Sequence, residues 1–146
     1  MADTIKNHVL SDSDERYAVH LTGVSDGTGE SAVIKVDKST LLALPYGTAA
    51  AAEPVSLDIE QIRWAIQGFS YIKLHWDHTT DDTAMLLCGS GYDDFRGEGG
   101  MLGNRTPRGL ADPRSSGDTG DLLLTSVGAA SGATYDITLW LRKTNK

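Results

Sequence analysis

The sequence predicts an all-β protein, an antiparallel β-sandwich of the jelly-roll type with one long glycine-rich loop. Two observations favour this fold class: apolar and polar residues alternate along several short runs, and glycine-containing turns separate these runs. The 146 residues fit a single domain spanning 1–146, which is large enough to bury a core of its own.

Four runs show the alternation, because successive side chains of a strand point to opposite faces. The sets expected on one face are Tyr17, Val19 and Leu21; Ala32, Ile34 and Val36; Ile72, Leu74 and Trp76; and Tyr135, Ile137, Leu139 and Leu141. The sets expected on the other face are Ala18 and His20; Val33 and Lys35; Tyr71, Lys73, His75 and Asp77; and Thr134, Asp136, Thr138 and Arg142. One buried and one solvated face is typical of antiparallel sheets.

The segment 55–66 changes parity half-way along. Its apolar residues fall into two sets, first Val55, Leu57 and Ile59, then Ile62, Trp64 and Ile66. A β-bulge around Glu60-Gln61 would place both sets on one side and let one long strand turn a sandwich corner. The alternative is an amphipathic helix over 56–67, but the β-branched residues and the following Gly68 favour the strand.

Turns are expected at 25–29, 77–82 and 128–132, and two insertions interrupt the pattern. The alanine-rich insertion 41–53 predicts a short helical excursion or a draped loop, because it is too short for a helix that is stable alone. The insertion 89–120 holds 9 of the 16 glycines, and a connection of this length usually marks a functional or a disordered loop.

The two halves of the 89–120 loop differ in composition. We expect the aromatic and apolar residues of the first half to pin it to the sandwich; they are Tyr92, Phe95, Met101 and Leu102. The second half carries Arg105, Arg108 and Arg114, which locally reverse the acidic balance of the chain. These arginines are candidate contacts to a partner protein.

Composition excludes several classes of function. Twenty acidic against 13 basic residues give a net charge of −7, whereas a sequence-independent nucleic-acid binder needs a basic surplus. No apolar stretch is long enough for a spanning helix, so we expect no membrane partner. The start of the chain has no signal-peptide pattern, which predicts synthesis in a cytoplasm without export. The single thiol, Cys88, follows an apolar run and is expected in the core.

The sequence contains no strong motif for catalysis or for binding a cofactor. Ser90 lies in Cys88-Gly89-Ser90-Gly91, which lacks the spacing of a nucleophile elbow, and neither a phosphate loop nor a dinucleotide fingerprint occurs. Asp93 and Asp94 are adjacent and therefore point apart. We expect no enzyme and no cofactor.

Two acidic segments are candidates for cation binding. The densest set of metal-ligand residue types is His75, Asp77, His78, Asp81 and Asp82, but a polar hairpin explains the same residues and the spacing fits no strong zinc signature. Residues 26–30 resemble an ordinary glycine turn more than a calcium loop. The sequence therefore predicts no metal site.

Three tryptophans separate into two kinds. Trp64 and Trp76 share the parity of their core sets and are expected to be structural. Trp140 has the polar-side parity of Thr138 and Arg142, so it either lies under the long loop or contributes to an interface, where tryptophan is enriched. Together with Tyr92, Trp140 completes the set of candidate partner-binding residues.

The chain resembles a small family of virion proteins of tailed phages, especially phages of marine bacteria. The resemblance covers most of the chain except 41–53 and 103–116. It rests on turn and core motifs at 22–31, 35–37, 64–68, 74–77, 79–82, 117–121 and 131–137, among them Trp64-Ala65-Ile66-Gln67-Gly68 and Leu74-His75-Trp76-Asp77. It implies capsid decoration (cement) or another structural role in the particle, and it supplies no catalytic residue.

The expected function is therefore a decoration protein on the outer face of the phage head, bound to the major capsid protein. We expect a homo-oligomer, for which a trimer at local three-fold positions is one form. The alternative is a tail, baseplate or fibre component, or a glycan-binding module in which Tyr92, Phe95 and Trp140 stack on sugars.

Overall fold

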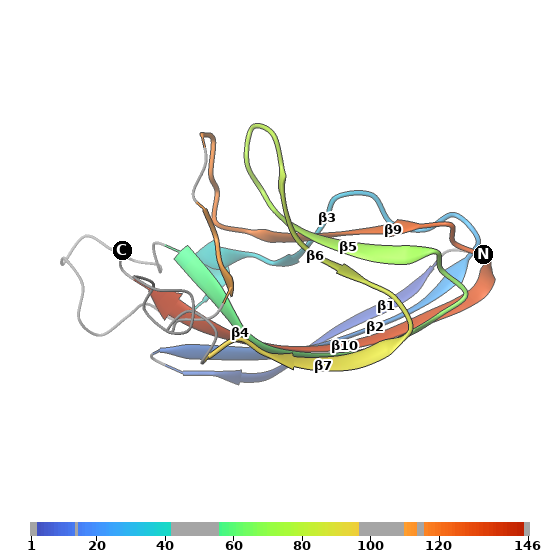
Figure 1. Cartoon of the computed structure of the whole chain (residues 1–146), viewed down its shortest axis with the longest axis horizontal. Helices are drawn as coiled ribbons and strands as arrows, with labels where there is room; N and C mark the ends of the chain where they lie inside the picture. The colour runs from blue at the N-terminus through green and yellow to red at the C-terminus, as the bar shows by residue number, and fades with distance from the viewer. Residues whose placement is uncertain (1–2, 14, 42–55, 97–109, 114–115, 145–146) are drawn as a thin grey trace.

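The structure is a computed structural model, which describes residues 3–13, 15–41, 56–96, 110–113 and 116–144. Its described part is almost entirely antiparallel strands in two stacked sheets (Figure 1). In chain order the strands are β1 (Thr4–Asp12), β2 (Arg16–Asp26), β3 (Val33–Val36), β4 (Ser56–Gln67), β5 (Tyr71–Trp76), β6 (Asp82–Leu87), β7 (Ser90–Asp94), β8 (Leu110–Ala111), β9 (Leu122–Val127) and β10 (Ser131–Thr144). A 3-10 turn, η1 (Lys38–Thr40), follows β3.

The strand order confirms the predicted jelly roll. One sheet runs β1-β2-β10-β4-β7, with the short β8 also paired to β4, and the other runs β3-β9-β5-β6. From β2 to β6 the chain alternates between the sheets except at the β5–β6 hairpin, and β9 and β10 lie in opposite sheets. This is the double Greek-key arrangement of jelly rolls, to which β1 adds one edge strand.

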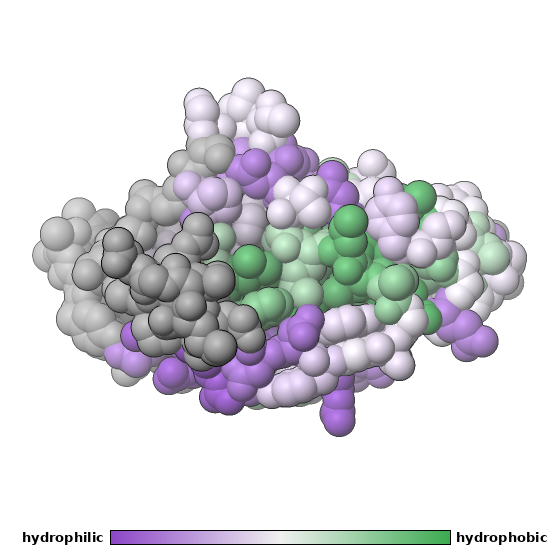
Figure 2. Space-filling view, in the orientation of Figure 1, coloured by the Kyte–Doolittle hydropathy of each residue, from purple (hydrophilic) through white to green (hydrophobic). Residues whose placement is uncertain are grey.

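The core fills the space between the two sheets. Alternate residues of the central strands are fully buried, as their parity predicts; they include Val19, Leu21, Ile72, Leu74, Trp76, Ile137, Leu139 and Leu141. Apolar surface also reaches solvent on the side between β6 and β7, where Figure 2 shows a green band. Leu86 of β6 is the most exposed large apolar residue among those described, at 62%.

The predicted bulge lies in β4 at Glu60. Along β10, Trp140 pairs with Gln61 and the next residue, Leu141, pairs with Ile59, so Glu60 is the extra residue. The bulge buries Ile59 and Ile62 on the same side of the sheet. The rival helix over 56–67 is wrong. The sandwich corner is wrong as well, because β4 pairs with β10 in the same sheet on both sides of the bulge.

Three expectations about burial are wrong, each for a local reason. Cys88 is exposed, because Leu87 is the last inward residue of β6 and Cys88 begins the turn to β7. The register of β3 shifts between Ile34 and Val36, so Ile34 is half exposed and Lys35 is buried. His75 has the outward parity but is buried, held by hydrogen bonds to Asp81 and Thr125.

The expected turns form, and part of the 89–120 segment is strand. Asp26 accepts hydrogen bonds from the backbone and hydroxyl of Thr28, and Gly27 and Gly29 have positive φ, as a glycine turn requires. Within 89–120 the residues of β7 and β8 pair with β4, and Phe95 packs against the core. Of the 41–53 insertion only Leu41 is among the described residues, and it is buried.

The part of the chain that the structure describes contains no helix that is long and apolar enough to cross a bilayer.

Candidate partner-binding site

Trp140 lies on the outer face of the larger sheet, where three strands bring small and polar residues beside it. On β10 it pairs with Ala18 of β2 and with Gln61 of β4. Its side chain is partly exposed and lines a pocket of about 410 Å³, to which β1 contributes Leu10. We call this cavity the Trp140 pocket.

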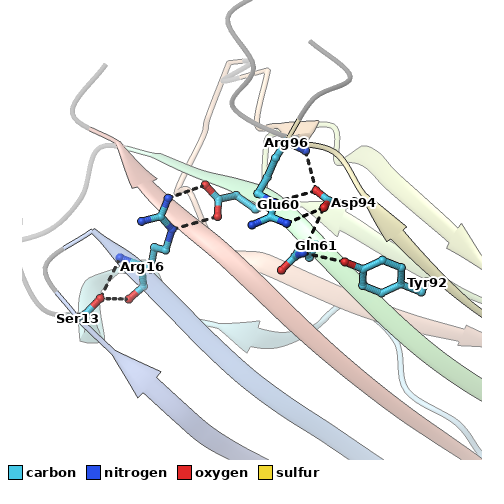
Figure 3. Close-up of polar contacts among 7 residues, drawn as sticks. All are labelled: Ser13, Arg16, Glu60, Gln61, Tyr92, Asp94 and Arg96. Atoms are coloured by element: carbon cyan, nitrogen blue, oxygen red, sulfur yellow. Dashed lines mark hydrogen bonds and ion pairs between the residues drawn. The ribbon is translucent and has the colours of Figure 1, made fainter. Parts of the chain in front are cut away.

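Gln61 connects the Trp140 pocket to Tyr92. The Gln61 side-chain amide donates a 2.7 Å hydrogen bond to the Tyr92 hydroxyl and a 3.3 Å bond to Asp94 Oδ2, both on β7 (Figure 3). Tyr92 is 54% exposed, so the contact holds its hydroxyl while its ring stays accessible to a partner. Two aromatic side chains of the outer face therefore flank one amide.

Arg96 closes the β7 side of the pocket. Its guanidinium donates to both carboxylate oxygens of Asp94, at 3.0 and 2.7 Å, and its backbone N–H donates to the same carboxylate. The hydrogen bonds from the Arg96 side chain and backbone hold the pKa of Asp94 well below its ordinary range. The pKa of Arg96 is raised in turn, by its hydrogen bond to Asp94 and by the carboxylate charge.

Arg16 lies on the opposite side of the pocket and is held by the bulge. The carboxylate of Glu60 accepts Arg16 Nε at 3.1 Å and Nη2 at 3.5 Å, which is a forked contact. The Glu60 side chain is almost buried, whereas the Arg16 side chain is 57% exposed. The bulge therefore supplies a fixed carboxylate that holds an accessible guanidinium at the rim (Figure 3).

The resulting surface combines residue types that dominate protein interfaces. Tryptophan, tyrosine and arginine are enriched among the few residues that dominate binding energy at protein interfaces, and here they line or adjoin one pocket. The arginines are already oriented by ion pairs, so a partner would meet them with less loss of side-chain freedom. Planar amide, guanidinium and carboxylate groups beside aromatic rings also suit a polar ligand such as a sugar.

The remainder of this outer face is hollowed and combines polar residues with apolar ones such as Val24, which is 47% exposed. A depression of about 640 Å³ lies beyond Thr134 and is lined by Lys6, Thr22, Val24 and Gln67, among others. Between it and Trp140, His20 Nε2 lies 2.6 Å from Asp136 Oδ1, in an exposed pair. The residues that the sequence pattern placed outward, His20 and Thr138 among them, therefore lie on one continuous face.

The structure places two of the five predicted partner-binding residues together. Tyr92 and Trp140 lie on either side of Gln61, and neither contributes to the core cluster. Arg105, Arg108 and Arg114 lie outside the described residues. Tyr92 fixes the first half of the loop to the sandwich as expected, through its hydroxyl and the pairing of β7 with β4, although its ring is exposed. Met101 and Leu102 lie outside the described residues. Trp64 and Trp76 are structural as expected: Trp76 is buried and Trp64 packs against the core.

Sequence reasoning missed Arg16, Arg96 and the role of Glu60 in the pocket. The spacing of Asp94 and Arg96, two apart at the end of a strand, was an available signal, because such residues share a face. The Arg16–Glu60 pair spans 44 residues and depends on the bulge, so no local pattern reveals it.

Comparison with known proteins adds no relative: no protein-family model, no curated protein and no solved structure matches the chain.

Proposed function

We propose that the chain is a structural protein of a tailed-phage particle, a decoration (cement) protein that binds the major capsid protein on the outer face of the head. The observation that carries the proposal is the Trp140 pocket with its arginine rim, which has the composition of a protein-binding surface. The proposal assigns the chain no catalytic role.

The fold supports this proposal by analogy. Jelly rolls occur in viral capsid proteins and in lectins, so the architecture agrees with a particle component but does not by itself define a function. The acidic surface, with a net charge of −7, argues against a role in binding the packaged nucleic acid. The resemblance to phage virion proteins points to the same class.

On a symmetric shell with many identical binding positions, a pocket that binds weakly is sufficient for attachment. A homo-oligomer, such as a trimer, would present several copies of the Trp140 pocket to a symmetric shell at once. Each contact after the first then forms at a high effective concentration, so weak single contacts give strong attachment. We therefore include self-association in the proposal.

Recognition of a glycan by a tail or baseplate component is the second candidate. The observation that favours it is the arrangement of Tyr92 and Trp140 around the Gln61 amide, since aromatic faces with planar hydrogen-bonding groups suit sugar rings. In that case the same pocket would bind a host polysaccharide rather than a capsid subunit.

Immunogold labelling of intact phage particles, with antibody against the recombinant chain, tests the location. Gold distributed over the head is the expected result, and gold at the tail tip would favour the glycan alternative. Particles without gold, when infected cells contain the antigen, would contradict both versions of the proposal.

A rebinding assay tests the pocket itself. Recombinant chain is mixed with particles that lack it, and co-sedimentation is measured for Trp140→Ala and for Tyr71→Ala. Tyr71 is a suitable control because it is exposed on the other sheet. We expect at least tenfold weaker rebinding for Trp140→Ala and normal rebinding for Tyr71→Ala; equal rebinding of the two variants would exclude the pocket.

A further inference from the structure

Two segments project together from the smaller sheet, on the side away from the Trp140 pocket (Figure 1). One is the β5–β6 turn, residues 77–81, and the other comprises the described residues between β8 and β9, which are 112–113 and 116–121. Backbone hydrogen bonds connect them: Thr79 N–H donates to Ser116 O at 2.9 Å, and Thr119 N–H donates to Asp77 O at 3.1 Å. Side chains from both segments can therefore share one site.

His78 lies at the centre of this contact, among carboxylates from the second segment. Its Nε2 is 2.8 Å from Asp112 Oδ1 and 3.6 Å from Asp118 Oδ1. One ligand atom from each of the three residues lies within 4.8 Å of the other two. Imidazole and carboxylate are both ligands of divalent transition metals.

The separations fit ligands of one ion. Bonds of about 2.1 Å from nitrogen and oxygen to a zinc-like ion place two neighbouring ligand atoms about 3.0–3.4 Å apart. The two distances from His78 Nε2, 2.8 and 3.6 Å, lie on either side of that range. The third separation, between the ligand atoms of Asp112 and Asp118, is at most 4.8 Å.

A third carboxylate, that of Asp82, fixes the orientation of the imidazole. His78 Nδ1 donates to Asp82 Oδ2 at 2.7 Å, which leaves Nε2 as the nitrogen directed at Asp112 and Asp118. Metal-binding histidines nearly always donate their second nitrogen to a carboxylate or carbonyl in this way, and the contact makes the imidazole a better ligand. This relation is separate from the convergence of the three ligand atoms.

Burial makes a divalent ion energetically useful here. The side chains of His78 and Asp112 have no exposed surface, and that of Asp118 is 15% exposed. Carboxylates that are removed from water next to one another are costly unless a cation neutralises them, and a divalent ion does this more completely than one proton on the imidazole. The partial exposure of Asp118 leaves a route from solvent.

We propose that His78 Nε2, Asp112 and Asp118 bind one divalent transition-metal cation of the Zn²⁺ or Mn²⁺ type. Asp82 positions the imidazole from outside the ligand set. The ion would connect the β5–β6 turn to Asp112 and Asp118 and so hold these two residues of the 89–120 segment against the sandwich. This inference is independent of the proposed virion role.

Equilibrium dialysis of the full, tag-free chain against ZnCl₂, with bound metal measured by mass spectrometry, tests the site. Asp118→Asn is the informative variant, because an asparagine oxygen can still accept the hydrogen bond that Gly120 N–H donates to Asp118 Oδ1. Asp136→Asn is the matched control, since Asp136 forms a similar contact with His20 on the exposed face. Circular dichroism checks that each variant folds.

We expect one equivalent of Zn²⁺ per chain, at least tenfold weaker binding for Asp118→Asn and unchanged binding for Asp136→Asn. If Asp118→Asn fails to fold, Asp82→Asn replaces it, for which a 10–100-fold loss is expected. Absence of stoichiometric uptake, or equal affinities of the site variant and the control variant, would overturn the proposal.

Discussion

The Tyr135 hydroxyl on β10 donates a 2.6 Å hydrogen bond to Glu30 Oε2, between the two sheets. Lys35 completes the triad by donating to the other Glu30 oxygen and, at 3.1 Å, to the Tyr135 hydroxyl. All three side chains are nearly or fully buried. Burial, and then the hydrogen bond to Glu30, raises the pKa of Tyr135 and so favours the neutral phenol.

Tyr135→Phe should destabilise the protein by about 1–3 kcal/mol, because Glu30 Oε2 loses its donor in a buried place. Urea unfolding followed by fluorescence gives the free energy. Ser131→Ala, at an exposed position of the same strand, is the control. A loss for Tyr135→Phe no greater than that of the control would show that the triad adds nothing to stability.

Lys35→Met should cost more, about 3–5 kcal/mol, because it leaves the Glu30 carboxylate buried without its cation. The double variant Lys35→Met/Glu30→Leu removes both charges and should be more stable than Lys35→Met alone. Unfolding free energies of the two single variants and the double variant measure the coupling. Additive losses would contradict the ion pair.

Gly23→Ala should destabilise the fold by about 1–3 kcal/mol through overpacking. A Cβ atom at Gly23 would lie 2.4 Å from Tyr135 Cε1, on the ring that carries the triad hydroxyl. Gly132→Ala tests the contrast, since no atom lies within 4 Å of its Cβ and only its positive φ opposes the change. The Tm of Gly23→Ala, measured by thermal unfolding, should be lower than that of Gly132→Ala. The reverse order would contradict the steric argument.

Asp121→Asn should stabilise the protein at neutral pH and lose this advantage in acid. Burial and the neighbouring charges of Asp37 and Asp77 raise the pKa of Asp121 in the folded state, so folding favours its protonated form. The resulting cost is present at pH 7 and vanishes below the ordinary value of 3.8, where both states hold the proton.

The measurement for this variant is Tm between pH 7 and pH 3. Asparagine retains an oxygen for the Lys38 N–H, which donates to Asp121 Oδ1 at 2.9 Å. We expect a rise in Tm of a few degrees at most at pH 7 that fades as the pH falls. A rise of constant size at every pH would show that charge is not the cause.

Parity along the chain was sufficient to predict the jelly-roll class, the bulge at Glu60 and the outward position of Trp140. The alternation pattern failed at Lys35, because a register shift in β3 directs the Lys35 side chain into the core, where it pairs with the carboxylate of Glu30. That shift depends on pairing with β9, about 90 residues further along the chain, which alternation within a short run does not encode.

The sequence likewise identified some residues of the candidate sites but not the contacts between them. Trp140 was identified by its polar-side parity and Tyr92 as an aromatic residue of the long loop. Gln61 joins them only through the register of three strands. His78 was noted for its local neighbours, whereas the carboxylates that converge on its Nε2 come from 34 and more residues away. Contacts of this kind require the folded chain.

The length of β4 is determined by the surface and not by the core. Without Glu60, Ile59 opposite Leu141 and Gln61 opposite Trp140 would be neighbours in an unbroken ladder, and both apolar sets would still face inward. The additional residue contributes a carboxylate for Arg16 and a carbonyl oxygen for the Phe95 amide. A one-residue deletion at this position would therefore spare the sandwich and dismantle the rim of the pocket, which separates the requirements of folding from those of binding within a single strand.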